Sequence, residues 1–246
     1  MTTLVTGVSR RAGIGFAVAR RLIAAGEDVV VASWPAHDEQ QPWGADDLPS
    51  LLGELGDPPH IEVDLADPTV PAALVRHARA EIGPLTALVA THARSATGSL
   101  AAVTAEELDA CFAVNARASV LLAQAFAVQY QPANGPGRVV LFTSGQHRGP
   151  MTGEIAYALS KGAIQQITAT LAAELGPAGI AVTCVNPGPT DTGWAEPDTY
   201  ARVAAAFPAG RWTTPEEVAA VVEWLLGESG MLLTGSTVDA EAGFHR

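Results

Sequence analysis

Tyr157 and Lys161 lie four residues apart in the stretch GEIAYALSKGAI, and Ser144 stands thirteen residues before the tyrosine. Residues i and i+4 of a helix share one face, so the Lys161 ammonium is expected beside the Tyr157 phenol. A nearby positive charge favours the phenolate and lowers the pKa of a tyrosine from its ordinary value near about 10. The three residues therefore predict a proton-transfer site with Tyr157 as acid or base. The same spacing also occurs on solvated helix faces, so the rest of the chain must decide between the two interpretations.

The composition is typical of one folded domain. The 246 residues are 48% hydrophobic and 16% charged, enough to bury the core of one large α/β domain spanning residues 1–246. A formal net charge of −12 argues against a nucleic-acid partner, because binding to a phosphate backbone needs a basic stripe. The first six residues begin a strand without a signal or membrane-spanning pattern, so we expect a cytoplasmic protein with no membrane partner.

The two cysteines, Cys111 and Cys184, stand in apolar segments that contain no metal-ligand spacing. Such cysteines behave as small buried side chains in a reducing compartment. We therefore expect no metal site.

Short apolar runs rich in β-branched residues alternate with helical patterns along the chain. The runs occupy residues 4–6, 28–33, 61–64, 85–90, 138–143 and 180–185. Helices are predicted to begin near residues 14, 104, 152 and 214, and the two long ones cover 104–129 and 152–176. This alternation predicts an α/β fold with a doubly wound parallel sheet in three layers. Two irregular stretches remain, 34–50 and 187–212, and the second is expected to cover the site.

A glycine-rich turn at residues 6–15 joins the first predicted strand directly to the first predicted helix. Gly7, Gly13 and Gly15 would let the backbone approach a pyrophosphate, and the helix N-terminus offers unpaired N–H groups. The alternative interpretation is a tight turn without a ligand.

These features follow the order found in the short-chain dehydrogenase/reductase family, which the chain resembles over nearly its whole length. The glycine turn is similar to the family's TGxxxGxG cofactor loop, and Asn115 in FAVNARASV is similar to the helix asparagine of its active-site tetrad. Ser144, Tyr157 and Lys161 stand at the spacing of the other three members. The resemblance implies a Rossmann-type, nicotinamide-binding domain with Asn115, Ser144, Tyr157 and Lys161 as the catalytic residues.

The resemblance also implies cofactor contacts along the chain. Asp64 is similar to the aspartate that holds the adenine amino group, and the stretch from Asn186 looks like the loop that fixes the nicotinamide carboxamide. The expected cofactor-binding residues are Gly7, Ser9, Arg10, Gly13, Ile14, Gly15, Ser33, Asp64, Leu65, Ala90, Tyr157, Lys161, Pro187, Gly188, Thr190 and Thr192.

The family resemblance implies a separate role for each residue of the tetrad. Ser144 would hydrogen-bond the substrate carbonyl, and Tyr157 would give that oxygen a proton while the reduced nicotinamide delivers hydride. Lys161 would stabilise the phenolate and bind the nicotinamide ribose. Asn115 would hold a water beside Lys161.

The chain departs from the family pattern at three places. Arg11 and Ala12 lengthen the glycine turn by two residues, and Glu241-Ala242-Gly243 replaces the usual Asp-Gly-Gly. Thr91 and His92 stand where many members carry Asn-Asn-Ala-Gly. His92 is either an additional acid or base, or a hydrogen-bonding replacement for the usual loop support.

Cofactor preference depends on the end of the second strand. NAD-preferring relatives place a carboxylate there, whereas this chain has Ser33. Arg10 stands where NADP-using relatives often carry a basic residue, and Ser33 could hydrogen-bond a phosphate. We therefore expect NADP(H) in preference to NAD(H).

The substrate is expected to be a small-molecule ketone or secondary alcohol. Ser144, Gln146, His147 and Trp194 are the expected substrate-binding residues. The chain most resembles the 3-oxoacyl-acyl-carrier-protein reductase-like branch, so an acyl thioester is a second candidate, with Arg94 and Arg148 as contacts for an acidic carrier. A dinucleotide-binding regulatory protein without turnover is the alternative function, but it would not need all four tetrad residues. The resemblance also implies a homotetramer or homodimer assembled through the two long helices.

Overall fold

A parallel sheet forms the centre of the protein in a computed structural model, which describes residues 1–195 and 197–245. Its strands are β1 Thr2–Thr6, β2 Asp28–Ser33, β3 His60–Glu62, β4 Ala87–Ala90, β5 Gly137–Phe142, β6 Ile180–Asn186 and β7 Thr237–Asp239. They lie in the order β3-β2-β1-β4-β5-β6-β7, and every neighbouring pair is parallel. The central strands are buried, which explains their nearly continuous apolar sequences.

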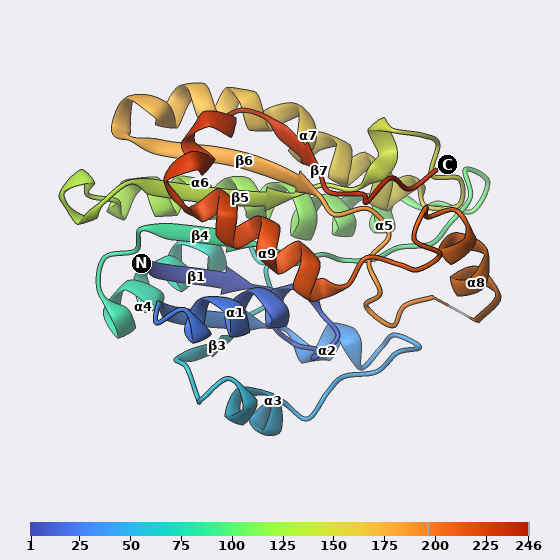
Figure 1. The fold of residues 1–246 in the computed structure, drawn as a ribbon, viewed down its shortest axis with the longest axis horizontal. Helices are drawn as coiled ribbons and strands as arrows, with labels where there is room; N and C mark the ends of the chain where they lie inside the picture. The colour runs from blue at the N-terminus through green and yellow to red at the C-terminus, as the bar shows by residue number, and fades with distance from the viewer. Residues whose placement is uncertain (196, 246) are drawn as a thin grey trace.

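Helices cover both faces of the sheet (Figure 1). They are α1 Ile14–Ala24, α2 Pro35–Asp38, α3 Leu48–Glu54, α4 Val70–Ile82, α5 Ala105–Cys111, α6 Ala118–Gln129, α7 Ile155–Leu175, α8 Pro197–Ala205 and α9 Pro215–Leu226. On one face, α1, α3 and α9 bury a cluster that includes Leu22, Leu51 and Val222. On the other face, α4, α6 and α7 bury a second cluster that includes Leu74, Phe126 and Ile164. The predicted three-layer, Rossmann-type single domain is confirmed.

The predicted helix over 104–129 is interrupted in the structure. Thr104 caps α5 by accepting a hydrogen bond from the Glu107 backbone N–H at 3.2 Å, as its spacing predicts. After α5, a π-helical turn occupies Phe112–Arg117, and α6 follows it. A π-helical turn holds one more residue than an α-helical turn, so α5 and α6 present their side chains in separate registers.

The stretch Ala105–Gln129 is also long and apolar enough to cross a membrane, by length and composition alone. Leu122 and Phe126 within it are fully buried against the sheet. These helices therefore belong to the core of the domain.

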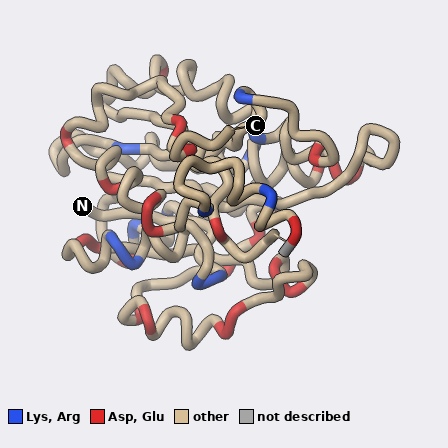
Figure 2. Tube along the Cα trace, turned by 45° about the vertical axis from the view of Figure 1, so that its right-hand side comes forward, with Lys and Arg blue, Asp and Glu red and all other residues tan. Residues whose placement is uncertain are grey.

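The segment predicted as irregular, 187–212, is helical in part, because α8 occupies Pro197–Ala205. Glu196, within the same segment, lies outside the described residues. The other irregular stretch, 34–50, contains α2 and the start of α3. Charged residues are spread over many elements, with acidic and basic positions interspersed (Figure 2).

The ends of β1 and β4 meet at the point where the strand order reverses. The helices that follow these two strands pack on opposite faces of the sheet, which is where ligands bind in open α/β sheets. Gly7 has a φ of +78°, and a Cβ on it would lie 2.7 Å from the backbone nitrogen of His92. A Cβ on Gly15 would lie 2.5 Å from the carbonyl oxygen of Gly7. Both positions therefore require glycine, and the two backbones form the floor of a crevice.

Candidate active site

A cavity of about 1210 Å³ opens at the carboxyl ends of the central strands. Nearly all the residues expected to bind cofactor line it, and they come from the glycine turn, the loops after β2, β3 and β6, and the start of α7. These lining residues are Gly7, Ser9, Arg10, Gly13, Ile14, Gly15, Ser33, Asp64, Leu65, Tyr157, Lys161, Pro187, Gly188, Thr190 and Thr192. Ala90 is the exception, because it is buried at the end of β4 and does not reach the cavity.

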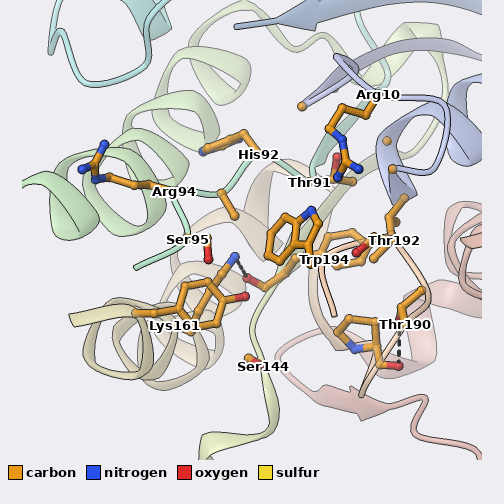
Figure 3. A pocket seen from close by; sticks show the side chains of 18 of the residues that line it. Arg10, Thr91, His92, Arg94, Ser95, Ser144, Lys161, Thr190, Thr192 and Trp194 are labelled. Carbon is orange, nitrogen blue, oxygen red and sulfur yellow. Dashed lines mark hydrogen bonds between the residues drawn. The ribbon is translucent and has the colours of Figure 1, made fainter. Parts of the chain in front are cut away.

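Ser144, Tyr157 and Lys161 converge on this cavity. Ser144 follows β5, whereas Tyr157 and Lys161 lie in the first two turns of α7. The Lys161 ammonium donates a hydrogen bond to the Phe142 carbonyl at 3.1 Å and lies 5.7 Å from the centroid of the Tyr157 ring. The Lys161 and Ser144 side chains are both directed into the pocket (Figure 3).

The electrostatics of Tyr157 differ from the expectation based on helix spacing. Burial raises the pKa of Tyr157 above its usual value, and the charge of Glu154 adds to the increase. A hydrogen bond with Ser144 acts in the opposite direction. Burial also lowers the pKa of Lys161 to about 8. Desolvation thus dominates at both groups, and Tyr157 is held as a neutral phenol, the form that can donate a proton.

Asn115 lies in the π-helical turn and does not line the cavity. Its Oδ1 accepts from the Arg94 backbone N–H at 2.6 Å, and its Nδ2 donates to the Arg94 carbonyl at 3.0 Å and to the Ser160 hydroxyl at 2.8 Å. Both Nδ2 donors are therefore used. The side chain fastens the loop after β4 to α7, which is a positioning role rather than direct contact with a substrate.

His92 is buried between β1 and the π-helical turn. Its Nε2 lies 3.1 Å from the Val114 carbonyl and its Nδ1 lies 2.7 Å from the Thr6 hydroxyl. A carbonyl can only accept, so Nε2 carries the proton and Nδ1 accepts from Thr6. Burial, followed by the charge of Lys161, lowers the pKa of His92 to about 3. This geometry favours the structural interpretation of His92 over an additional acid or base.

The two arginines of the lengthened glycine turn point in different directions. Arg11 Nε lies 2.6 Å from Glu54, and its backbone N–H donates to Asp46 at 2.6 Å, so Arg11 fastens the turn to the segment around α3. Arg10 lines the cavity instead, 4.0 Å from Asp38 and 5.6 Å from the ring of Trp43.

Asp38 carries no sequence signal for a place in the site, because it stands five residues beyond Ser33, the last residue of β2. Its carboxylate accepts from Trp43 Nε1 at 3.0 Å and borders the cavity. The Ser33 hydroxyl is hydrogen-bonded to His60 Nε2 at 2.7 Å. The end of β2 thus offers a buried carboxylate as well as a serine.

Only some of the expected substrate contacts reach the cavity. Trp194 lines it and stacks on Trp43, with ring centroids 4.8 Å apart and planes within 10° (Figure 3 shows Trp194 projecting into the pocket). Gln146 and His147 do not line it, so the expectation for both is corrected. Gln146 Nε2 donates to Thr143 and Gln165 at 3.0 Å each, and His147 Nε2 lies 2.9 Å from Asp239. Their side chains are held by α7 and β7 rather than by the pocket.

Several cavity residues carried no motif that would have singled them out. Ser95, Thr97 and Thr152 supply hydroxyl groups, and Glu154 also lines the cavity. Ser95 and Thr97 stand in the loop after β4, whereas Thr152 and Glu154 stand just before α7, so only the completed fold brings them to one cavity.

Comparisons with known proteins agree with this fold and site. A family model described as enoyl-(acyl carrier protein) reductase matches residues 7–245. The uncharacterised oxidoreductase YjdA of Bacillus subtilis is 33% identical over 244 residues, covering 99% of this chain and 96% of YjdA. The L-xylulose reductase of Bos taurus is 32% identical over 246 residues, covering 98% of this chain and 95% of the reductase.

Two solved structures have the same arrangement. A blue fluorescent protein from a metagenomic library, in complex with NADPH, has a TM-score of 0.87 at 29% identity and covers 99% of this chain and 97% of its own. A short-chain dehydrogenase/reductase from Serratia marcescens has a TM-score of 0.83 at 27% identity, with coverages of 98% and 97%.

The fold and the pocket define a nicotinamide-dependent oxidoreductase that acts on carbonyl or alcohol groups. The chain belongs to the short-chain dehydrogenase/reductase family.

Because His92 is buried and neutral, the free energy of unfolding should depend on pH. The folded-state pKa lies below the unfolded value, so the unfolded chain binds the proton first and the stabilisation is lost as pH falls from about 6.5 toward about 3. His92→Leu should lower the free energy of unfolding at pH 7 by about 1–3 kcal/mol, because Thr6 and Val114 lose their partner. It should also flatten the dependence on pH within that window, as measured by urea unfolding. An unchanged slope in His92→Leu would contradict the assignment.

Proposed function

We propose that the protein is an NADP(H)-dependent oxidoreductase that transfers hydride between the nicotinamide and a ketone or secondary alcohol. Tyr157 is its general acid and base. The observation that carries the proposal is the convergence of Ser144, Tyr157 and Lys161 on a cavity whose opposite wall is the glycine turn.

The residues present fit a dinucleotide. Gly13, at the N-cap of α1, has no side chain to cap the helix, and Ile14 and Gly15 line the cavity. The uncapped N–H groups and the positive end of the helix would hold the pyrophosphate. Asp64 and the segment from Pro187 to Thr192 would hold the two ends of the molecule.

Each side chain of the site then has its own role in the reaction. The bound nicotinamide supplies or accepts hydride. Ser144 donates a hydrogen bond to the substrate oxygen, and Tyr157 gives that oxygen its proton. Lys161, whose pKa is lowered to about 8, remains largely an ammonium at neutral pH and stabilises the phenolate as it forms. Asn115 positions the loop after β4 through its hydrogen bonds to the Arg94 backbone.

A small-molecule carbonyl compound is favoured over a thioester on a carrier protein. Arg94 lies 3.1 Å from Glu107, and Arg148 lies 3.6 Å from Glu241. Both arginines that could meet an acidic carrier therefore already face carboxylates, and the chain carries a net charge of −12. The similarity to L-xylulose reductases supports a small hydroxylated substrate.

The segment 187–212 is proposed to cover the bound molecules. Trp194, Thr199 and Trp212 of this segment line the cavity. The stack of Trp194 on Trp43 joins the segment to the loop after β2, on the other side of the cleft.

Arg10 supports the preference for NADP(H). It lies in the cleft, and its partners Asp38 and Trp43 hold the guanidinium at the end of β2, where a 2′-phosphate would lie. Asp38 opposes this preference, because a carboxylate repels a phosphate.

A cytoplasmic homotetramer or homodimer is proposed on the basis of exposed apolar side chains on the long helices. Phe112, Val128 and Leu159 are 49%, 84% and 59% exposed. They lie on the π-helical turn, α6 and α7, the elements expected to pair.

Both cysteines are buried and unpaired, which agrees with a reducing compartment.

Tyr157→Phe should lower the rate of hydride transfer by about 100- to 10,000-fold, because the proton donor is lost. Titration of nicotinamide fluorescence should give a dissociation constant for NADPH close to that of the wild-type protein, because the variant keeps the aromatic ring and all the other residues expected to bind the cofactor. Tyr130→Phe is the matched control, since its hydroxyl bonds Gly135 outside the cavity. Full activity in Tyr157→Phe would overturn the proposed mechanism.

Arg10→Ala should weaken NADPH binding by about 10- to 100-fold, the value of one or two charge-assisted hydrogen bonds, with little effect on NADH. Asp38→Asn should strengthen NADPH binding, because it removes the repulsion. Fluorescence titration with each cofactor measures both effects. Arg11→Ala, whose guanidinium faces α3, is the control, and equal loss of both cofactors in Arg10→Ala would contradict the proposed preference.

Light scattering coupled to size-exclusion chromatography should give the mass of a dimer or tetramer for the wild-type protein. Val128→Glu combined with Leu159→Glu should reduce that mass, because two charges would be buried in the pairing face. A monomeric wild-type protein would contradict the proposed assembly.

A further inference from the structure

Glu154 lies at the N-cap of α7, three residues before Tyr157. Its backbone forms a bridge with Gly98, and Ile155 donates to the Gly98 carbonyl at 3.4 Å. The start of α7 is thereby fixed against the loop after β4. The Glu154 side chain makes no capping hydrogen bond to α7 and lines the cavity.

The Glu154 carboxylate differs from the other carboxylates of the cavity. Within the described residues, four line it, and three accept hydrogen bonds. Asp38 accepts from Trp43 at 3.0 Å, Asp64 from the Ala66 backbone at 2.8 Å and Asp191 from Tyr200 at 3.1 Å. No hydrogen bond or ion pair holds the Glu154 carboxylate in the part of the chain that the structure describes.

The surroundings of Glu154 make an unpartnered carboxylate unfavourable. The side chain is half-buried, and burial alone raises its pKa. Glu154 stands three residues before Tyr157 at the start of α7, and both residues line the cavity. Its charge therefore reaches the reacting group and raises the pKa of Tyr157. A hydrogen-bond donor brought by a substrate would relieve the desolvation of the carboxylate and lie close to the carbonyl that Tyr157 protonates.

We propose that Glu154 is a specificity-determining residue that accepts a hydrogen bond from a hydroxyl group close to the reacting carbonyl of the substrate. The preferred substrate class is an uncharged hydroxylated ketone and the corresponding polyol. The hydroxyls of Ser95, Thr97 and Thr152 line the same cavity and suit a substrate with several hydroxyl groups. A substrate with a carboxylate or phosphate at that position is rejected, because like charges would meet. This inference rests on the proposed function.

Four ketones of nearly equal size test the inference: hydroxyacetone, 2-butanone, aminoacetone and pyruvate. Hydroxyacetone and 2-butanone differ only by a hydroxyl in place of a methyl group. The full-length protein with NADPH should reduce hydroxyacetone with a kcat/KM about 10- to 100-fold above that for 2-butanone. Pyruvate should be the poorest of the four.

Two variants at Glu154 separate charge from hydrogen bonding. In Glu154→Leu the preference for hydroxyacetone over 2-butanone should fall to near unity, mainly through a higher KM for hydroxyacetone. Glu154→Gln keeps an acceptor and should retain most of the preference. If aminoacetone is the best substrate and loses the most in Glu154→Gln, the recognised donor is an ammonium group, and the assignment of a hydroxyl is wrong. Glu174→Leu, on the exposed side of α7, is the matched control and should leave the ratio unchanged.

A binding measurement distinguishes failure of this inference from failure of the proposed function. Calorimetric titration of hydroxyacetone into the NADPH complex of Tyr157→Phe, with and without Glu154→Leu, reports recognition without turnover. Binding that is lost only in the double variant supports the role of Glu154, even if the wild-type protein reduces none of the ketones and the proposed function fails. Turnover of both ketones at a ratio that Glu154→Leu and Glu154→Gln leave unchanged overturns the inference alone.

Discussion

The backbone of the glycine turn touches the backbone after β4 at points where a Cβ would not fit. Gly7 approaches His92, and Gly15 approaches both Gly7 and the Thr91 hydroxyl. Thr91 also donates to the Thr6 carbonyl at 2.6 Å. These contacts set the distance between the first helix and the loop that carries the substrate end of the cavity. The glycine turn, which would hold the cofactor, and the proton-transfer residues Ser144, Tyr157 and Lys161 can therefore face one another only while the two backbones stay this close.

His92 extends the same contact into the second layer of helices. By bonding Thr6 on one side and Val114 on the other, it links β1 to the π-helical turn. Asn115, one residue further, ties that turn to the loop after β4 and to α7. A continuous set of hydrogen bonds thus runs from the glycine turn to the helix that bears Tyr157. Thr91 and His92 supply side-chain hydrogen bonds at this junction, to Thr6 on β1 and to the Val114 carbonyl.

The alternation of strands and helices and the glycine turn could be predicted from the sequence, because each depends on local patterns of apolar residues, caps and spacing. The resemblance to the family pointed to Ser144, Tyr157 and Lys161, and the structure brings these three to one cavity. The directions of side chains in loops could not be predicted. Arg10 and Arg11 are adjacent in sequence, yet Asp46 and Glu54 draw Arg11 away from the cleft. Gln146 and His147 stand two and three residues after Ser144, but Gln165 and Asp239 hold them outside the pocket. The pKa of Tyr157 likewise depends on how deeply the completed fold buries it, which helix spacing does not reveal.

The π-helical turn at Phe112–Arg117 separates two helices that each have their own neighbours. α5 packs against α7 beside the site, and α6 packs against α4 in the core. One residue corresponds to about 100° of rotation in an α-helix. Removing a single residue from this turn would force either Asn115 out of its bonds or Leu122 and Phe126 out of the core. The widened turn thus rotates α6 relative to α5. The residues with which α6 packs in the core and those with which α5 packs beside the site can therefore vary independently, because neither set determines the orientation of the other helix.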